Sequence, residues 1–377
     1  MTKTNSTRAL VAHEPSNGQL NWKLEDVNLR ELQPNELLVR IVAVGVCHTD
    51  LVFGMWPPDQ IPYPKVLGHE GSGIVLQAGA DVRSASTGDP VLLSFQCCNA
   101  CKNCAASHPS FCDQFGLLNY GGDGSSYTTS ENKELRGAFF GQSSFAQVAI
   151  VKESSVVNVS GSIESEEELK IFAPMGCGFQ TGMGTVENVA DAGEDDAVVV
   201  LGLGGVGLLS IVAAKLKGCK AIIGIDRLPE RLELAKELGA TGVINTLDKD
   251  VDIAERLAEL TNGEGASVTI DTTGNLDLIR QAVQWTTNRG QIILVGVPAP
   301  DAQLDVHLIQ FMQTGKIIRG SIEGDATPSK YIPKMIKWYR ERKLPIEKLI
   351  KLYPMDKFQE ALADMKTGAT VKPVLVW

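Results

Sequence analysis

The chain has 377 residues, a formal net charge of −10 and 44% hydrophobic residues, so it is long enough for two domains that each bury a core. The acidic balance argues against nucleic acid or an anionic membrane surface as a partner. A membrane span needs about 18 or more apolar residues in a row, and we find no such run and no signal-peptide core, so we expect a cytoplasmic protein without membrane contact.

Up to about Pro174, the sequence is typical of a β-rich domain with many loops. Short segments rich in β-branched residues alternate with Gly, Pro and Asp turns. The predicted strands include Leu37–Val46, Gly73–Leu76 and Pro90–Ser94.

Four cysteines in this domain follow the spacing C-x2-C-x2-C-x7-C. Four thiolates this close in sequence can fill the tetrahedral shell of a structural zinc, which then has no open position and no catalytic role. Cys97 could replace the first ligand, and a buried or disulfide-bonded cluster is the alternative. A reducing compartment favours metal over disulfide. The predicted ligands are Cys98, Cys101, Cys104 and Cys112.

From about Asp196 to Val297, apolar runs alternate with amphipathic stretches. Continuous apolar strands between helices predict a parallel sheet covered on both faces. The predicted strands are Ala197–Leu201, Ala221–Ile225, Gly242–Ile244, Val268–Asp271 and Gln291–Val295, and the predicted helices are Gly205–Lys217, Arg227–Leu238 and Leu276–Trp285.

A glycine-rich turn between the first of these strands and its helix predicts a dinucleotide site. The turn fits G-x-G-x-x-G, in which glycines let a pyrophosphate approach the free N–H groups at a helix N-terminus. Its residues are Gly202, Gly204, Gly205, Val206 and Gly207.

Asp226 ends the second strand, about twenty residues past this turn. A carboxylate there accepts hydrogen bonds from the adenosine ribose and repels a 2′-phosphate, which favours NAD over NADP. Arg227 follows directly and could instead pair with a phosphate.

Residues from about Asp325 onward predict helices and a final strand that return to the first domain. We therefore expect a catalytic domain at 1–178 with a zinc lobe at 95–115, a dinucleotide-binding domain at 179–323, and a return to the catalytic domain at 324–377.

A second, catalytic zinc needs three protein ligands and one open position. Cys47, His69 and Cys177 each stand beside glycines and are candidates. The residues alone leave open that each is a buried thiol or a core histidine.

The motifs GVCHTD, GHEGSG, MGCGFQTGMG and LGLGGVG, together with the four-cysteine lobe, occur in an order and spacing that resemble zinc-dependent medium-chain alcohol dehydrogenases over essentially the whole chain. The resemblance implies an α/β protein, in which a GroES-like β-rich catalytic domain is joined to a Rossmann domain with a doubly wound parallel sheet. It also implies two zincs per chain, NAD, and an alcohol or aldehyde substrate.

The resemblance further assigns roles to single residues. Cys47, His69 and Cys177 match the catalytic zinc ligands. The other matches are Glu70 as a nearby acid that transiently displaces a ligand, Asp50 as the carboxylate that orients the histidine, Thr49 as the hydroxyl that takes the alcohol proton, His48 and Lys372 as cations beside the pyrophosphate, Thr181 near the nicotinamide, and Arg231 near the adenosine ribose.

One position departs from many relatives. A histidine relay residue three positions after the proton-accepting hydroxyl is here Val52, which cannot transfer a proton. This valine, the insertion at 119–137 and FFGQSSFA resemble the benzyl/aryl-alcohol dehydrogenase branch and imply an aromatic or allylic primary alcohol. Ser94 and Trp56 are candidate pocket walls.

Two alternatives remain open at this stage. One is an aldehyde reductase of a biosynthetic route, which would use the same site in the opposite direction. The other is a structural or regulatory subunit that binds zinc and nucleotide but has lost turnover. The resemblance also implies a homodimer or homotetramer, for which Gln291–Ile309 is the candidate interface.

Overall fold

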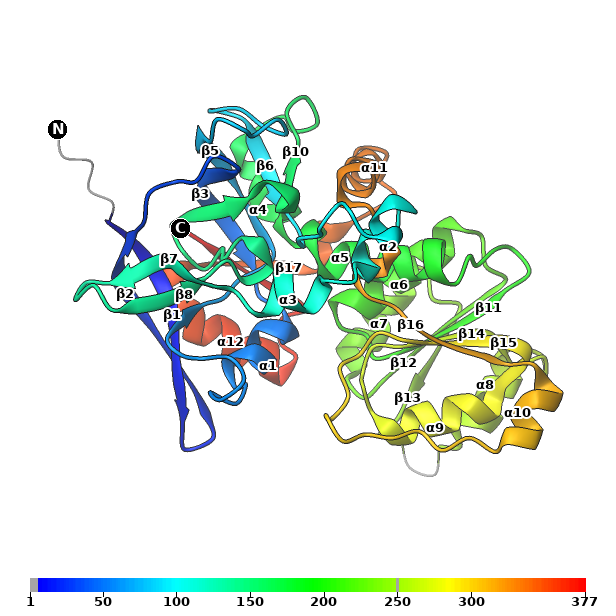
Figure 1. The fold of residues 1–377 in the computed structure, drawn as a ribbon. Helices are drawn as coiled ribbons and strands as arrows, with labels where there is room; N and C mark the ends of the chain where they lie inside the picture. The colour runs from blue at the N-terminus through cyan, green and yellow to red at the C-terminus, as the bar shows by residue number, and fades with distance from the viewer. Residues whose placement is uncertain (1–5, 249–250) are drawn as a thin grey trace. The chain divides into compact units, whose positions relative to one another are not determined.

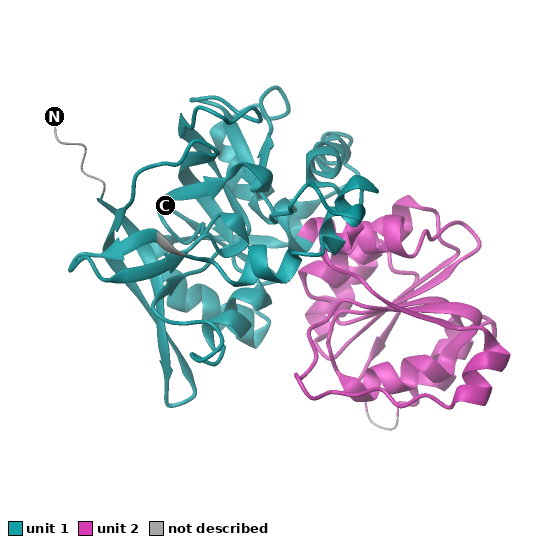
Figure 2. Cartoon of the chain, viewed as in Figure 1, with its two compact units in different colours: residues 1–178, 327–377 teal, residues 179–326 magenta. Residues whose placement is uncertain are grey.

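The computed structural model describes residues 6–248 and 251–377, which form two compact units (Figure 2). Unit 1 comprises Met1–Gly178 and Thr327–Trp377, and unit 2 comprises Phe179–Ala326. The chain therefore leaves unit 1 once and returns to it. Within the described ranges, every helix is too short or too polar to cross a lipid bilayer.

Unit 1 contains a closed barrel in the order β1-β2-β7-β8-β4 (Figure 1). Its first two strands are joined at Asn17 and Gly18, which both have positive φ and so suit a two-residue hairpin turn. The barrel strands are β1 (Ser6–Ser16), β2 (Gln19–Leu29), β4 (Lys65–Val66), β7 (Asp123–Thr129) and β8 (Glu134–Gly137).

A seven-stranded sheet lies beside the barrel in unit 1, in the order β10-β6-β5-β3-β18-β17 with β9 also paired to β3. The C-terminal strand β18 pairs antiparallel with β3, so that Val374 lies opposite Gly45. This pairing brings the end of the chain to the strand that leads to Cys47. The strands are β3 (Glu36–Gly45), β5 (Gly71–Ala78), β6 (Pro90–Leu93), β9 (Val148–Lys152), β10 (Val156–Asn158), β17 (Ile350–Pro354) and β18 (Lys372–Val376).

Short helices connect these strands, and two hydrophobic clusters lie in unit 1, one of them rich in aromatic side chains. The helices are α1 (His48–Gly54), α2 (Lys102–Ala105), α3 (Phe115–Tyr120), α4 (Glu166–Phe172), α11 (Pro328–Arg340) and α12 (Phe358–Thr367), with 3-10 turns that include η2 (Phe139–Gly141) and η4 (Ala173–Gly176).

Unit 2 is a parallel sheet in the order β13-β12-β11-β14-β15-β16 (Figure 1). Numbered within the unit, this order is 3-2-1-4-5-6, that of a doubly wound dinucleotide-binding fold. Its strands are β11 (Ala197–Leu201), β12 (Ala221–Asp226), β13 (Gly242–Asn245), β14 (Ala266–Asp271), β15 (Thr286–Leu294) and β16 (Ile317–Gly320), and its helices are α5 (Gly178–Gly184), α6 (Gly205–Leu216), α7 (Pro229–Leu238), α8 (Ile253–Leu260), α9 (Leu276–Trp285) and α10 (Leu308–Thr314).

The predicted fold class is confirmed, and the predicted elements of unit 2 agree with the structure to within a few residues. β11 and α9 have the predicted bounds, whereas β15 begins at Thr286 rather than Gln291. This strand follows α9 without an intervening loop, so no turn signal marks its start.

Lys65 is a buried cation in the strand that leads to His69. Lys65 is 3% exposed, and no described residue accepts a hydrogen bond from its Nζ, which lies 3.8 Å from the centroid of the Tyr63 ring. Burial, helped by the charge of Arg136, lowers the pKa of Lys65 from its ordinary 10.5 to about 8.

We expect Lys65→Met to raise the free energy of unfolding at pH 7, measured by urea titration, by about 1–2 kcal/mol after the lost contact with the Tyr63 ring is subtracted. Below pH 8 the lysine is charged in both the folded and the unfolded state, so its desolvation cost is present in full. The cost disappears as the pH rises from 8 to 10.5, and the free energies of unfolding of wild type and Lys65→Met should then converge. A pH-independent difference would contradict this account.

Candidate active site

Helix α1 begins at the first predicted zinc ligand. Cys47 is its N-cap residue, and the Asp50 carboxylate reaches back so that Oδ2 accepts from the Cys47 backbone N–H at 3.0 Å. An acid three residues after the cap is the usual way to satisfy a free N–H at a helix start. The local sequence Cys-His-Thr-Asp therefore fixes the backbone at Cys47.

The same carboxylate holds His69. Asp50 Oδ1 accepts from the Gly68 N–H at 3.0 Å and lies 2.9 Å from His69 Nδ1, and both side chains are fully buried. Gly68 has φ +88°, and a Cβ there would lie 2.5 Å from the Phe145 nitrogen. Only glycine fits this bend. Through its two oxygens, Asp50 therefore contacts two candidate ligands from different elements, the backbone of Cys47 and the ring of His69.

Cys177 follows the 3-10 turn η4, whose last carbonyl, at Gly176, accepts from Ser94 Oγ at 2.6 Å. The adjacent Gly178 N–H donates to Glu70 Oε1 at 3.0 Å. Lys372 Nζ is buried and lies 2.9 Å from each oxygen of Glu70. Glu70, next to His69, and Lys372, from the C-terminal strand β18, thus form a buried ion pair.

The side chains of Cys47, His69, Glu70 and Cys177 bring their ligand atoms within 4.8 Å of one another. Tetrahedral zinc with bonds of about 2.0–2.3 Å has ligand atoms about 3.3–3.8 Å apart, so the group is compact enough for one ion. His69 Nε2 is buried and has no hydrogen-bond partner among the described residues. Two thiols and an imidazole are a donor set that fits zinc.

The electrostatics of this group favour a thiolate. The pKa of Cys47 lies well below its ordinary value, chiefly because it receives a hydrogen bond from Cys177; burial opposes this shift and the charge of Lys372 adds to it. Burial would lower the pKa of Lys372, but the charges of Glu70 and Cys47 outweigh it and raise that pKa. Zinc binds the thiolate form, so the site is prepared for a cation.

The four-cysteine lobe also forms a compact group. Cys98, Cys101, Cys104 and Cys112 bring their sulfurs within 4.8 Å of one another. The Sγ atoms of Cys98 and Cys104 are 3.9 Å apart and those of Cys101 and Cys104 are 3.5 Å apart, close to the edge of about 3.8 Å expected for ZnS4. Cys97 lies outside the group and instead donates to Asn99 Oδ1 at 3.1 Å.

The predicted proton-transfer residues lie on α1. Thr49 Oγ1 is 3.7 Å from Cys47 Sγ. His48 is exposed, and Val52 lies four residues further along the helix, on the same face as His48 and one turn from Thr49. The two candidate wall residues differ: Ser94 is buried and bonded to Gly176, whereas Trp56 is partly exposed and stacks on Phe53 with ring centroids 4.9 Å apart.

The glycine-rich turn in unit 2 has the geometry of a phosphate loop. Gly202 has φ +84°, and a Cβ on Gly207 would lie 1.9 Å from the Gly202 carbonyl oxygen. Gly204 is the N-cap residue of α6, and Gly205 and Val206 begin that helix. The turn follows β11, next to which the strand order reverses, where such sheets bind ligands.

Asp226 lies beside this turn. Its Oδ2 accepts from the Leu203 N–H at 2.7 Å, and its Oδ1 accepts from the N–H groups of Arg227 and Leu228 at 2.7 and 2.9 Å. Arg231, on α7, is 7% exposed, and burial lowers its pKa while the charge of Asp226 opposes the shift. Thr181 lies on α5, which packs against α6 so closely that a Cβ on Gly182 would be 2.3 Å from the Val206 oxygen.

The sequence did not reveal the residues that surround His69. Gln142 Nε2 donates to the carbonyls of His69 and Ser94, both at 2.9 Å, and its Oε1 accepts from the Gly71 N–H at 3.1 Å. Phe140 stacks on the imidazole of His69. Both residues belong to the segment FFGQSSFA, whose paired aromatics were the only signal.

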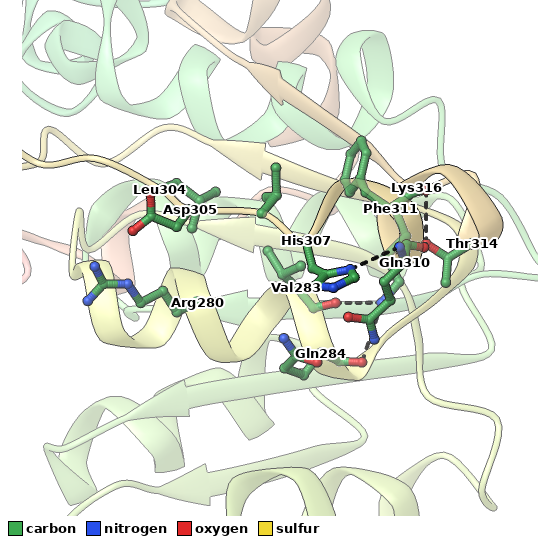
Figure 3. A pocket seen from close by; sticks show the side chains of 11 residues that line it. Arg280, Val283, Gln284, Leu304, Asp305, His307, Gln310, Phe311, Thr314 and Lys316 are labelled. Atoms are coloured by element: carbon green, nitrogen blue, oxygen red, sulfur yellow. Dashed lines mark hydrogen bonds between the residues drawn. The ribbon is translucent and has the colours of Figure 1, made fainter.

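A cavity of about 290 Å³ in unit 2 holds none of the predicted site residues (Figure 3). It lies between α9 and α10, where His307 Nδ1 accepts from the Gln310 N–H at 3.3 Å. Its lining mixes cationic, polar and apolar side chains without a cluster of ligand atoms. The candidate sites are therefore the two thiol clusters in unit 1 and the glycine-rich turn in unit 2.

Comparison with known proteins gives matches over nearly the whole chain. Residues 33–161 match the family described as alcohol dehydrogenase GroES-like domain, and residues 205–341 match that described as zinc-binding dehydrogenase. Geraniol dehydrogenase of Castellaniella defragrans is 38% identical over 358 residues, which is 94% of each chain.

Two crystal structures have the same fold. Benzyl alcohol dehydrogenase of Acinetobacter calcoaceticus superposes with a TM-score of 0.89 at 34% identity, covering 98% of this chain and 99% of the other. An alcohol dehydrogenase zinc-binding domain protein of Burkholderia ambifaria gives a TM-score of 0.91 at 34% identity, covering 98% of each chain.

Proposed function

The chain belongs to the zinc-dependent medium-chain alcohol dehydrogenases, and we propose that it oxidises a primary alcohol to the aldehyde with NAD, at a zinc held by Cys47, His69 and Cys177. Two observations support this ligand set most strongly: a ring nitrogen of His69 and the two thiols lie within 4.8 Å of one another, and the buried His69 Nε2 has no hydrogen-bond partner among the described residues.

The bound zinc supplies a Lewis acid that lowers the pKa of an alcohol hydroxyl. Two thiolates, from Cys47 and Cys177, balance the charge of the ion. Glu70 and Lys372 neutralise each other at 2.9 Å and so leave that balance unchanged. Asp50 holds the His69 ring through Nδ1, which leaves Nε2 for the metal.

The proton of the alcohol passes first to Thr49. A hydroxyl can accept one proton while it donates its own, and Thr49 Oγ1 lies 3.7 Å from a proposed ligand sulfur. His48 is the adjacent side chain, and its imidazole can take up and release a proton. We propose that the proton leaves Thr49 by way of His48 or water, since Val52 offers no group to receive it.

An aromatic or allylic alcohol is the proposed substrate class. Aromatic side chains of unit 1 gather near His69: the ring of Phe53 lies 4.8 Å from that of Tyr120 and 5.2 Å from that of Phe139, and the Phe139 ring lies 5.6 Å from the His69 imidazole. The relatives named for geraniol and benzyl alcohol agree with this class.

NADH formation with a panel of alcohols tests the proposed function. We expect benzyl and geranyl alcohol to exceed ethanol in kcat/KM by about 100-fold, because burying a large apolar group contributes about 3 kcal/mol. Zinc-dependent turnover with ethanol alone would support the activity and reject the substrate class. Absence of turnover with every alcohol would reject the activity itself.

We also propose that Cys98, Cys101, Cys104 and Cys112 hold a second, structural zinc with no open position. Unoxidised thiols fit a reducing compartment, which supports a cytoplasmic location. Unit 1 would then provide the catalytic domain and unit 2 the dinucleotide site.

Asp226 is the proposed determinant of NAD specificity. Asp226→Asn should shift the ratio of kcat/KM for NAD to that for NADP toward NADP by about 10–100-fold, because a charge-assisted ribose hydrogen bond contributes about 1.5–3 kcal/mol. Asparagine retains one oxygen for the Leu203 N–H, whereas the N–H groups of Arg227 and Leu228 lose their acceptor, so thermal stability is measured together with the ratio. A wild-type enzyme that prefers NADP would contradict this assignment and make Arg227 the determinant.

The proposed oligomer interface lies along α10 and β16 of unit 2. Leu308, Ile309 and Met312 are 75%, 61% and 74% exposed, and β16 is an edge strand of the sheet. Apolar side chains beside an unpaired strand edge suit a second copy of the chain related by a two-fold axis. The predicted segment Gln291–Ile309 covers only part of this surface, since Ile292 and Ile293 are buried.

We expect Met312→Asp to convert the wild-type oligomer to a species of half the mass or less in light scattering at micromolar concentration, because it places a charge in an apolar contact. Leu247→Asp is the control, since Leu247 is 70% exposed and lies after β13 at the other edge of the sheet. A monomeric wild-type protein would exclude the interface.

A further inference from the structure

The imidazole of His69 is held on three sides by buried groups. The ring of Phe140 stacks on its face, with centroids 4.6 Å apart and an interplanar angle of 27°. The Phe139 ring meets it edge-on at 86°, and Asp50 Oδ1 lies 2.9 Å from its Nδ1. The imidazole can therefore neither tilt nor turn without displacing a packed ring.

Phe140 reaches this position through an unusual backbone conformation. Its φ of +52° and ψ of +31° are left-handed, a region that bulky side chains rarely adopt. Such a conformation persists only where the surroundings fix it, and it is common at functional sites. In an ordinary right-handed or extended conformation, the ring would point elsewhere.

Hydrogen bonds on both sides fix the segment. Ser155 Oγ donates to the Phe140 carbonyl at 2.9 Å. Ser143 Oγ accepts from the Phe139 N–H at 3.0 Å and donates to the Val66 carbonyl at 2.6 Å. Gln142 binds the His69 carbonyl, so the segment contacts both the backbone and the ring of the candidate ligand.

We propose that Phe140 is a positioning residue for the catalytic zinc, whose ring keeps the His69 imidazole in the plane that directs Nε2 toward Cys47 and Cys177. The inference rests on the proposed zinc site. Asp50 fixes one ring nitrogen by a hydrogen bond but leaves rotation about that bond; the stacked ring of Phe140 removes this freedom. The ring of Phe140 contacts the imidazole of His69 and the rings of Phe115, Tyr120 and Phe139, and we propose that it acts on the metal through His69.

Chelator titration of the zinc-loaded enzyme tests the inference. Phe140→Leu should release one zinc per chain at about tenfold lower chelator concentration than wild type, because loss of a group that orients a ligand typically weakens metal binding 10–100-fold. The second zinc, at the four cysteines, should be retained as in wild type. In the cobalt-substituted protein, the visible d–d bands of the released site should also shift.

Phe358→Leu is the matched control. Phe358 is buried in the same aromatic-rich core, but its ring stacks on no other ring of the described residues. It should lose stability without a change in zinc release. Should Phe140→Leu not accumulate, Phe140→Met fills more of the space without a flat ring and is expected to release zinc early in the same way.

The positioning role would be overturned, and the proposed function left intact, if the Phe140 variant released zinc at the same chelator concentration as Phe358→Leu. The same holds for Phe140→Met if that variant is used. A wild-type protein that holds one zinc per chain and keeps it in Cys47→Ser would instead overturn the proposed catalytic site, and the inference with it.

Discussion

Replacing Cys47 with serine is expected to leave one zinc per chain instead of two and to lower kcat/KM for alcohol oxidation by about 1,000-fold or more. Cys47, His69 and Cys177 lie within 4.8 Å of one another, and loss of one thiolate leaves two strong ligands. Lewis-acid stabilisation contributes several kcal/mol to such a reaction, and each ~1.4 kcal/mol corresponds to a factor of ten. Metal analysis and steady-state kinetics on the purified variant measure both effects.

Cys101→Ser is the matched control for the other thiol cluster. It should also remove one zinc, but its main effect should be on folded yield and thermal stability, because a site that assembles on folding adds its binding free energy to stability. If Cys101→Ser kept both zinc content and stability, the four-cysteine site would be wrong. If Cys47→Ser stayed active with two zincs, the catalytic site would be wrong.

Unit 2 could be predicted from the sequence because its strands are buried on both faces. A run such as Ala197–Leu201, with all five residues buried, has no other favourable place than the middle of a covered sheet. The glycine-rich turn and Asp226 follow from two such strands, and the parallel order then brings both to the same edge. Local patterns are sufficient there.

Unit 1 was less predictable, because its elements depend on contacts between distant segments. The β1–β2 hairpin is not among the predicted elements although Asn17-Gly18 is a strong turn signal, and the seven residues of α1 are too few to show a helical period. Glu70 and Lys372 are 302 residues apart in the chain. Only the pairing of β18 with β3 brings them together.

The residues that support His69 could not be derived from any pattern. Phe140 gains its role from a left-handed backbone, and Gln142 gains its role from three hydrogen bonds to other segments. Neither property is encoded in residue type or spacing. The ligands, by contrast, are cysteines and a histidine beside glycines, which residue chemistry alone makes candidates.

The proton path is the second place where a large effect is expected. Thr49 and Val52 lie one turn apart on α1, and His48 is exposed at the start of that helix. Thr49→Val should therefore lower kcat by about 100-fold or more, since general acid–base groups typically contribute 10²–10⁴-fold. Thr49→Ser keeps the hydroxyl and should retain much of the activity. A fully active Thr49→Val enzyme would mean that the proton leaves without this hydroxyl.

Val52→His tests where the proton goes next. On α1 the new imidazole would stand one turn from Thr49 and on the same face as His48, so it would offer a second acceptor with an ordinary pKa near 6.5. If proton release limits oxidation at low pH, Val52→His should raise kcat there and shift the acid limb of the pH–rate profile downward. At high pH the kcat values of wild type and Val52→His should converge, because solvent then accepts the proton readily. An unchanged profile would show that hydride transfer or NADH release limits turnover, and that the valine at this position costs the enzyme nothing in rate.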